Sequence, residues 1–335
     1  MRGPPRGSSP AFVESAHPPR WKTLIAFAII YFVWGSTFYA IRVGVHEVPP
    51  LLLAALRFTI AGAVLFAWAV ARGERLPSRR EWAATALVAL LIFVVDYGFL
   101  FWAEQRVPSG TAAVILATIP AFMALAEITL LRTERLTFRL GSALLIGLAG
   151  VVVLVDPALG MAGTPVYTLG AVGLLVSAVS WSLASVLSKK LSMPSSKVMS
   201  AAAQMLVGGL LLCIVAAAAG EERGFHAGAV SSGAWIALAY LTVAGSLVGF
   251  TAYTWLIHHQ SPTKVGTYAY VNPVVAVALG HFLGGEVLDS RTVAGTALVL
   301  LSVIVITTRR RTNAGAGSAA SRVASDAPGQ PDTQP

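Results

Sequence analysis

The chain has 335 residues, of which 56% are hydrophobic and only 12% are charged, and its mean hydropathy is +0.73. Soluble proteins carry about 25% charged residues, so this composition indicates a protein that lies in a membrane. The net charge of +9 would suit a nucleic-acid-binding protein, but the positive residues lie between apolar runs rather than in one patch, which excludes that class. The single cysteine, Cys213, excludes an intrachain disulfide framework and a cysteine-based metal site.

Ten apolar segments follow one another along the chain, and each has about the 20 residues that a helix needs to cross a bilayer. In chain order they are Thr23–Gly44, Leu51–Ala71, Trp82–Trp102, Pro108–Leu131, Phe138–Val155, Val166–Leu187, Val198–Ala219, Ala234–Ile257, Pro262–Leu283 and Val293–Thr308. Their connections are short and leave no room for a soluble domain. The sequence therefore predicts an all-α integral membrane protein with ten transmembrane helices.

The two ends of the chain differ from the rest. Residues 1–22 and 309–335 are rich in Pro, Gly, Ser, Ala and Arg, which predicts disordered tails, and the first has no apolar core of a signal peptide. With both tails in the cytoplasm, 19 of the 24 lysines and arginines lie on the cytoplasmic side, four lie outside and Arg57 lies within a span. This bias follows the positive-inside rule, so we expect a multi-pass protein of the cytoplasmic (plasma) membrane.

A long pattern occurs twice. The segment Pro108–Leu136 has a proline at its start, a second proline, Pro120, near its middle and a charged turn at its end. The same order returns about 150 residues later in Pro262–Leu288, with Pro273 at the place of Pro120. Because a proline inside a helix removes a backbone hydrogen bond, two at matching places indicate an internal repeat.

Other residues support the repeat, among them Trp34 with Trp181 and Gly141 with Gly295. Residues 23–155 and 166–308 then form two repeats of five spans each, joined by a linker over 156–165. Because five is odd, the second repeat enters the membrane from the opposite side. The sequence thus predicts two inverted five-helix repeats, an arrangement that favours alternating access.

These motifs resemble the drug/metabolite transporter superfamily in its ten-span EamA-type branch. The residues that carry the resemblance are Trp34-Gly35-Ser36-Thr37-Phe38, Leu56-Arg57-Phe58, Ala117-Thr118-Ile119-Pro120, Asn272-Pro273 and Gly285-Glu286. The resemblance covers about Leu24 to Thr308 and would make each half an EamA-like repeat. It implies secondary transport of small metabolites, often export of amino acids or related compounds, through a central cavity lined by spans one, three, four, six, eight and nine.

The expected function is therefore a secondary transporter that exports a small amphipathic, amino-acid-like metabolite, with protons as a candidate coupling ion. The alternatives are a lipid or drug flippase of the same fold, a membrane-embedded enzyme and a scaffold that does not transport. A membrane-embedded enzyme would need clustered His, Asp or Cys residues, and the sequence contains no evident cluster. The internal repeat disfavours a scaffold that does not transport. The sequence contains no phosphate-binding loop and no metal-ligand spacing, so we expect neither a cofactor nor a metal.

Three residues are candidates for coupling. Asp96 is an isolated carboxyl group in the third span and is either a proton carrier or a hydrogen-bond acceptor for a neighbouring helix. Arg57, in the second span, either lines an external vestibule or is a snorkelling or helix-end arginine paired with an acid. His281, in the ninth span, can exchange protons near neutral pH, but its Gly280–Gly284 spacing favours close helix packing instead.

The substrate-binding candidates are aromatic or uncharged polar residues on the expected cavity helices. They are Trp34, Tyr97, Thr118, Trp181, Tyr253, Tyr270 and Asn272. Pro120 and Pro273 are expected to break their helices and to free the carbonyl groups of Leu116 and Ala269. The sequence predicts an aromatic, mostly uncharged pocket, and ordinary helix packing is the alternative for each residue taken singly.

Overall fold

The computed structural model describes residues 19–131, 138–155, 165–260, 265–266 and 268–307. The predicted linker and C-terminal tail lie outside these ranges, apart from Pro165. The first helix begins at Arg20, three residues before the start predicted for the first span.

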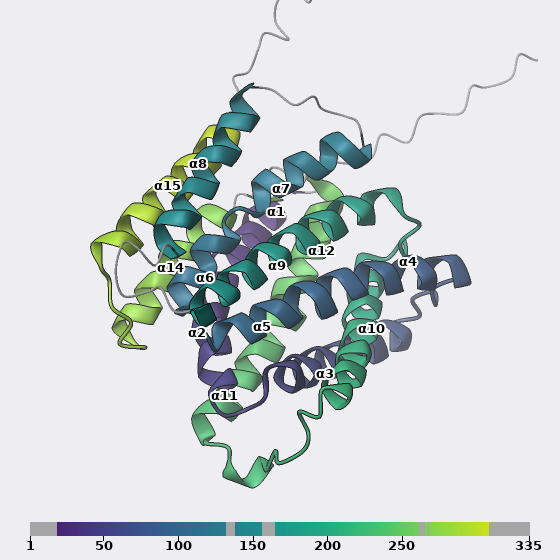
Figure 1. Cartoon of the computed structure of the whole chain (residues 1–335). Coiled ribbons are helices and arrows are strands. Elements are labelled where there is room, and N and C mark those ends of the chain that lie inside the picture. Colours follow the sequence, from purple (N-terminus) through teal and green to yellow (C-terminus); the bar gives the residue numbers. More distant parts are fainter. Residues whose placement is uncertain (1–18, 132–137, 156–164, 261–264, 267, 308–335) are drawn as a thin grey trace, which may run out of the picture.

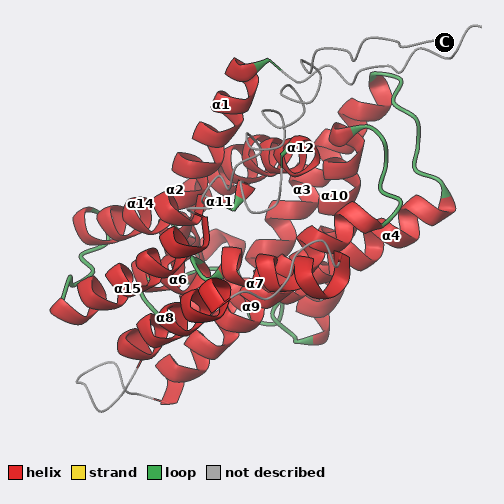
Figure 2. Cartoon of the chain, turned by 90° about the horizontal axis from the view of Figure 1, so that it is seen from above, coloured by secondary structure: helices red, strands yellow, loops and turns green. Residues whose placement is uncertain are grey.

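The described chain is almost entirely helical and follows the predicted order of spans (Figures 1 and 2). The first half consists of α1 (Arg20–Ala28), η1 (Ile29–Val33) and α2 (Trp34–Val45); α3 (Pro50–Ala71); α4 (Arg79–Ala89), η2 (Leu90–Tyr97) and α5 (Gly98–Glu104); α6 (Ser109–Leu116), α7 (Ile119–Ala126) and η3 (Glu127–Leu131); and α8 (Phe138–Val155). The second half consists of α9 (Pro165–Lys190); α10 (Lys197–Ala218); the short η5 (Ala227–Ala229); α11 (Ser232–Tyr240), η6 (Leu241–Phe250) and α12 (Thr251–His259); α14 (Tyr268–Phe282); and α15 (Ser290–Thr307).

Seven continuous helical stretches in the described ranges are long and apolar enough to cross a membrane. They correspond to spans one to four and six to eight. The helices α8, α14 and α15 occupy the places of spans five, nine and ten. The prediction of an all-α membrane protein with ten helices is confirmed.

The packing of the helices has the two-fold pattern expected of inverted repeats. Three pairs of equivalent spans pack on each other, namely α3 on α10, α8 on α15, and α6 on α14. Four further contacts form exchanged pairs: α2 packs on α11 and α14, and α9 packs on α5 and α7. Figures 1 and 2 show α8 and α15 at one edge of the bundle and α3 and α10 at another, with α2, α6 and α9 between them.

The crossing of α3 and α10 is close because two equivalent positions are glycines. A Cβ atom on Gly62 would lie 2.6 Å from the Cα atom of Leu206, and one on Gly209 would lie 2.8 Å from the carbonyl carbon of Phe58. Each of these contacts is with backbone that cannot rotate away. The absence of a side chain at both positions lets the two backbones touch, as small residues do in many membrane-helix pairs.

The third and eighth spans share a feature that the sequence analysis did not predict. Each changes from α-helix to a π-helical stretch near its middle, η2 in the first half and η6 in the second. A π-helical turn is wider than an α-helical turn and shifts the carbonyl groups away from their regular partners. Because both stretches occur at equivalent places, they belong to the repeat.

The loops on one side of the bundle place acidic side chains at helix N-termini. We call this side of the bundle the Glu286 side. The opposite side, where the described chain begins and ends, is called the terminal side. Carboxylate oxygens accept backbone N–H groups at the starts of four spans: Glu221 from Leu52, Glu286 from Ser109 and Gly110, Glu47 from Ser231, and Asp289 from Thr292. Carboxylates satisfy the free N–H groups there and complement the helix dipole. Hydrogen bonds from the side chain and backbone of Ser231 hold the pKa of Glu47 below its usual value.

The glycine crossing predicts a difference between two substitutions of the same kind. Gly209→Ala places a methyl group against the backbone of α3 and should lower the free energy of unfolding by about 1–3 kcal/mol, as overpacking does. Gly141→Ala, in α8, meets no atom within 4 Å and should leave stability unchanged or slightly raised. Thermal unfolding of the purified proteins in detergent compares them, and equal melting temperatures would contradict the close-crossing argument.

Candidate functional site

A small cavity lies between the two halves, where α2 and α14 face η2, α6 and α9. Its volume is about 50 Å³, and its walls are mainly aromatic and aliphatic. The residues that line it are Trp34, Thr37, Phe38, Asp96, Tyr97, Leu100, Ala113, Leu116, Ala117, Ile119, Trp181, Tyr268, Ala269 and Asn272. Ligand pockets usually measure about 300–1,000 Å³, so this cavity is too small for a typical ligand in the conformation described.

Aromatic rings from both halves meet at one wall of the cavity. The ring centroid of Trp34 lies 5.5 Å from that of Trp181, its repeat equivalent, in an edge-to-face arrangement. It also lies 5.1 Å from Tyr253 and 5.5 Å from Tyr268. Tyr97 completes the group at 6.0 Å from Trp181. Such distances and tilts are those of favourable aromatic pairs, so the rings support one another.

Some of the polar atoms of these rings have hydrogen-bond partners and others do not. The indole N–H of Trp34 donates to the carbonyl oxygen of Gly245 in η6 at 3.1 Å. The hydroxyl of Tyr253 shares a 2.6 Å hydrogen bond with the hydroxyl of Ser185. The indole N–H of Trp181, which is buried, meets no acceptor in hydrogen-bonding geometry within the described ranges. The equivalent tryptophans therefore differ, and only Trp34 is anchored to the opposite half.

Asn272 connects the ninth span to the π-helical stretch of the first. With its amide nitrogen facing η1, it donates to the carbonyl oxygens of Tyr31 at 2.8 Å and Ile30 at 3.1 Å. The π-helical turn releases these carbonyls, and a membrane supplies no water to satisfy them. The side chain of Asn272 is buried, so it serves both as a helix link and as a polar part of the cavity wall.

The fourth span breaks where the sequence predicts it. The helix α6 ends at Leu116, α7 begins at Ile119, and Pro120 stands in the first turn of α7. At the break, the hydroxyl of Thr118 donates to the carbonyl oxygen of Ile115 at 2.7 Å. Ala117 and Ile119 line the cavity on either side of Thr118.

The equivalent proline of the ninth span behaves differently. Pro273 lies inside α14, which continues from Tyr268 to Phe282. Its predicted helix break is therefore wrong for the described part of this span. The hydrogen bonds of Asn272 to η1 help to hold this part of α14 against the first span.

A row of serines on α9 was missed by the sequence analysis. Ser180 donates to the carbonyl oxygen of Leu91 in η2 at 2.8 Å, and Ser182 donates to that of Ile119 at the break of the fourth span at 3.1 Å. Ser177 donates to the carboxyl group of Asp96. Ser177 and Ser180, three residues apart, share one side of α9 and face η2, whereas Ser182 lies on nearly the opposite side, toward the fourth span. The recurrence of serine within an apolar span was the signal available in the sequence.

Asp96 lies in η2, lines the cavity and is only 3% exposed. Its one described hydrogen bond is with Ser177, and no ion pair to it occurs in the part of the chain that the structure describes. Both readings of this residue survive, because the carboxyl group accepts a hydrogen bond from a neighbouring helix and also faces the cavity.

Arg57 is more deeply buried than the sequence analysis expected, with 1% exposure. Its guanidinium carbon lies 4.6 Å from the ring of Phe58 and 5.2 Å from that of Tyr97, and its Nε donates to Ser246 at 2.8 Å. Within the described ranges it has no acidic partner, and one terminal nitrogen has no acceptor. The reading of Arg57 as a helix-end arginine paired with an acid is therefore not supported.

Two other candidates lie differently from expectation. His281 is exposed and not packed, and its Nδ1 atom lies 2.9 Å from the carbonyl oxygen of Glu286, away from the cavity. The packing expected from the Gly280–Gly284 spacing is therefore wrong for the histidine. Tyr270 lies on α14, and its side chain is outside the described part of the structure.

The contact between Asn272 and η1 predicts that donors are needed at this position. Asn272→Asp keeps the shape and replaces the amide donors by acceptors that face two carbonyl oxygens. It should lower thermal stability more than Asn272→Ala, which leaves two unsatisfied carbonyls at a cost of about 1–3 kcal/mol each. Melting in detergent at neutral pH measures both variants. A more stable Asp variant than Ala variant would show that the amide does not donate to η1.

Known proteins share this arrangement of spans. A crystal structure of a protein that is 26% identical to the chain superposes with a TM-score of 0.62, covering 87% of this chain and 97% of the other. An Escherichia coli K12 protein named uncharacterized inner membrane transporter YedA is 37% identical over 284 residues, covering 84% of this chain and 89% of that protein. A Salmonella typhimurium protein named a probable amino-acid metabolite efflux pump is 26% identical over 287 residues, covering 83% and 92% of the two chains.

The sequence pattern of the EamA-like transporter family matches the chain twice, over residues 21–156 and again over 168–308. These two ranges correspond to the two five-span halves. The double match, the similarity to YedA over most of both chains and the two-fold packing of the helices agree with one another. The chain belongs to the EamA-like transporter family and is a membrane transporter.

Proposed function

We propose that this protein exports a small amphipathic, amino-acid-like metabolite across the cytoplasmic membrane as a secondary transporter that works by alternating access. The observation that carries the proposal is the cavity between the two inverted halves, lined by aromatic rings and one buried carboxyl group. Inverted repeats commonly place the substrate site at their interface near the membrane midplane. The name of the Salmonella relative supports the substrate class and the direction.

In this proposal, Trp34, Tyr97, Trp181 and Asn272 contact the substrate. Thr118, Tyr253 and Tyr270 complete the predicted site as supporting or wall residues. A cavity of about 50 Å³ is far below the usual size of a ligand pocket, so binding requires the halves to separate. The unpartnered indole N–H of Trp181 is then available to an acceptor on the substrate.

Asp96 is the proposed proton carrier, because it is the carboxyl group that faces the cavity. Arg57 lies behind Tyr97 and supplies a fixed positive charge near the site. His281 lies apart from the cavity, so the proposed coupling rests on Asp96 and not on the histidine.

The terminal side is the proposed cytoplasmic side, with both tails in the cytoplasm. The basic residues gather in the loops of the terminal side, whereas the Glu286 side carries the acidic helix caps. This distribution is what the positive-inside rule requires.

Transport assays in proteoliposomes test the coupling role. The liposomes are preloaded with a pool of amino acids and common metabolites, and efflux is measured with and without an inward proton gradient. The gradient should raise wild-type flux, and Asp96→Asn should remove this increase because its side chain cannot exchange a proton. Ser177→Ala is the matched control, since it removes the hydrogen bond to Asp96 but keeps the carboxyl group.

If Ser177→Ala loses the gradient effect as fully as Asp96→Asn, the hydrogen bond and not proton exchange is what matters. If the gradient has no effect on wild-type flux, the protein is a facilitator.

The binding role of Trp181 is tested separately. Trp181→Phe keeps an aromatic ring but removes the indole N–H, so the KM for the transported substrate should rise about fivefold to tenfold, the value of one hydrogen bond. Trp255→Phe, on α12 and stacked on His259 away from the cavity, is the control and should leave KM unchanged. Equal KM values for the two variants would remove Trp181 from the proposed site.

A further inference from the structure

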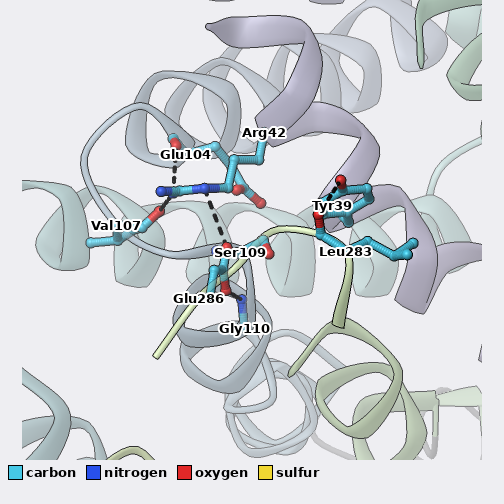
Figure 3. A network of polar contacts seen from close by, with 8 residues as sticks. All are labelled: Tyr39, Arg42, Glu104, Val107, Ser109, Gly110, Leu283 and Glu286. Carbon is cyan, nitrogen blue, oxygen red and sulfur yellow. Dashed lines mark hydrogen bonds and ion pairs between the residues drawn. The ribbon is translucent and has the colours of Figure 1, made fainter. Parts of the chain in front are cut away.

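A polar network closes the bundle on the Glu286 side (Figure 3). One carboxylate oxygen of Glu286 accepts the backbone N–H and the hydroxyl of Ser109, at 2.8 and 2.7 Å, and the other accepts the N–H of Gly110 at 3.2 Å. Arg42 forms an ion pair with the same carboxylate, and its Nε atom lies 3.2 Å from Oε1 of Glu286. The loop after α14 is thereby attached to the start of α6 and the end of α2.

Glycine makes this approach possible. A Cβ atom on Gly280 would collide with the carboxylate of Glu286. The carbonyl oxygen of Leu283 also accepts the hydroxyl of Tyr39 at 3.1 Å, so the same loop is held to α2 at a second point (Figure 3). The network therefore joins spans one, four and nine where alternating access requires them to separate.

A second carboxyl group lies beside this network without a bonding partner. Glu104, the last residue of α5, is fully buried, and neither carboxylate oxygen has a hydrogen bond within the described ranges. It interacts electrostatically with the positive charge of Arg42 and the negative charge of Glu286. Arg42 instead donates to the backbone carbonyl oxygens of Val107 at 2.8 Å and Glu104 at 3.5 Å.

A buried carboxyl group without a donor costs free energy unless another state satisfies it. Arg42 is the positive charge that acts on Glu104, and in this conformation it is paired with Glu286. If the loop that carries Glu286 moves away from α6, Arg42 loses its partner while Glu104 remains beside it. An arginine that has a carboxylate available in both conformations avoids an unpaired buried charge in either one.

We propose that Glu104 is the exchange partner of Arg42, which pairs with Glu286 when the outer end is closed and with Glu104 when it is open. Glu104 thus acts through Arg42 as a positioning residue that sets the balance between the two conformations. The assignment rests on the alternating access and the orientation proposed above, with the Glu286 side facing outward.

This role predicts that replacing Glu104 shifts the balance toward the closed outer end, whereas the loss of an ordinary structural contact would loosen it. Glu104→Gln keeps the size of the side chain but cannot ionise. The closed outer end is little changed, because burial without a donor favours the neutral carboxyl group there, whereas the open end loses an ion pair. The loss in the open state favours closure. Glu286→Gln weakens the cap on α6 and favours opening. If Glu104 merely held the structure together, its replacement would loosen the outer end instead.

Hydrogen–deuterium exchange of the segment 105–116 in the full-length protein in nanodiscs measures this balance, because the N–H groups of Ser109 and Gly110 are the ones that Glu286 holds. We expect exchange to be at least about fivefold slower in Glu104→Gln and at least about fivefold faster in Glu286→Gln, the lower range of measured coupling between sites. Glu47→Gln, which removes a carboxylate from the start of α11 on the same side, is the control and should leave this segment unchanged.

Glu104→Asp keeps the charge and shortens its reach, so its exchange should lie between those of the wild type and Glu104→Gln; it also serves if the glutamine variant does not fold. Faster or unchanged exchange in Glu104→Gln overturns the assignment. If wild-type liposomes show no flux but the variants shift in opposite directions, the proposed function fails and the role of Glu104 stands. If wild-type liposomes show flux but the two variants shift exchange in the same direction, the proposed function stands and the proposed role of Glu104 is wrong.

Discussion

Inside a membrane, a carbonyl group released from its helix has no water to bind, so the protein itself must supply a donor. This constraint decides how the spans around the cavity meet. The π-helical stretch η1 releases two carbonyls that Asn272 satisfies, and η2 releases that of Leu91, which Ser180 satisfies. At the break of the fourth span, Ser182 donates to Ile119. These irregularities of the backbone are thereby points of attachment to another span, and two of the residues involved, Asn272 and Ile119, line the cavity.

The two halves satisfy their free carbonyl groups with different residues, so the repeat is only approximate around the cavity. In the first half Ser182 of α9 approaches the carbonyl oxygen of Ile119 beside Pro120, while it also bonds Ala178 of its own helix at 2.6 Å, whereas in the second half Asn272, next to Pro273, donates to the first span. Trp34 is anchored to Gly245 but its equivalent Trp181 is not anchored. A two-fold frame thus encloses an asymmetric cavity, which suits a substrate that has no symmetry of its own.

The spans could be predicted from the sequence because a run of about 20 apolar residues has few other stable structures. It also drew attention to Trp34, Trp181 and Asn272 by their places in the repeat or beside a proline, and these residues line the cavity. The π-helical stretches were not predictable, since η2 contains neither proline nor glycine and depends on contacts with α9. Glu104 was missed because its meaning depends on Arg42 and Glu286, which lie far from it in the sequence.

The wall of aromatic rings has a consequence for the entropy of the transport cycle. A tryptophan or tyrosine side chain has only two main rotatable bonds, so fixing it costs less conformational entropy than fixing a long flexible side chain of similar area. Trp34 and Tyr253 are in addition held by their hydrogen bonds to Gly245 and Ser185. When the halves move, these rings can shift as rigid plates without gaining or losing many rotamers. The cavity can therefore close around a substrate, or around nothing, at nearly the same cost in side-chain order.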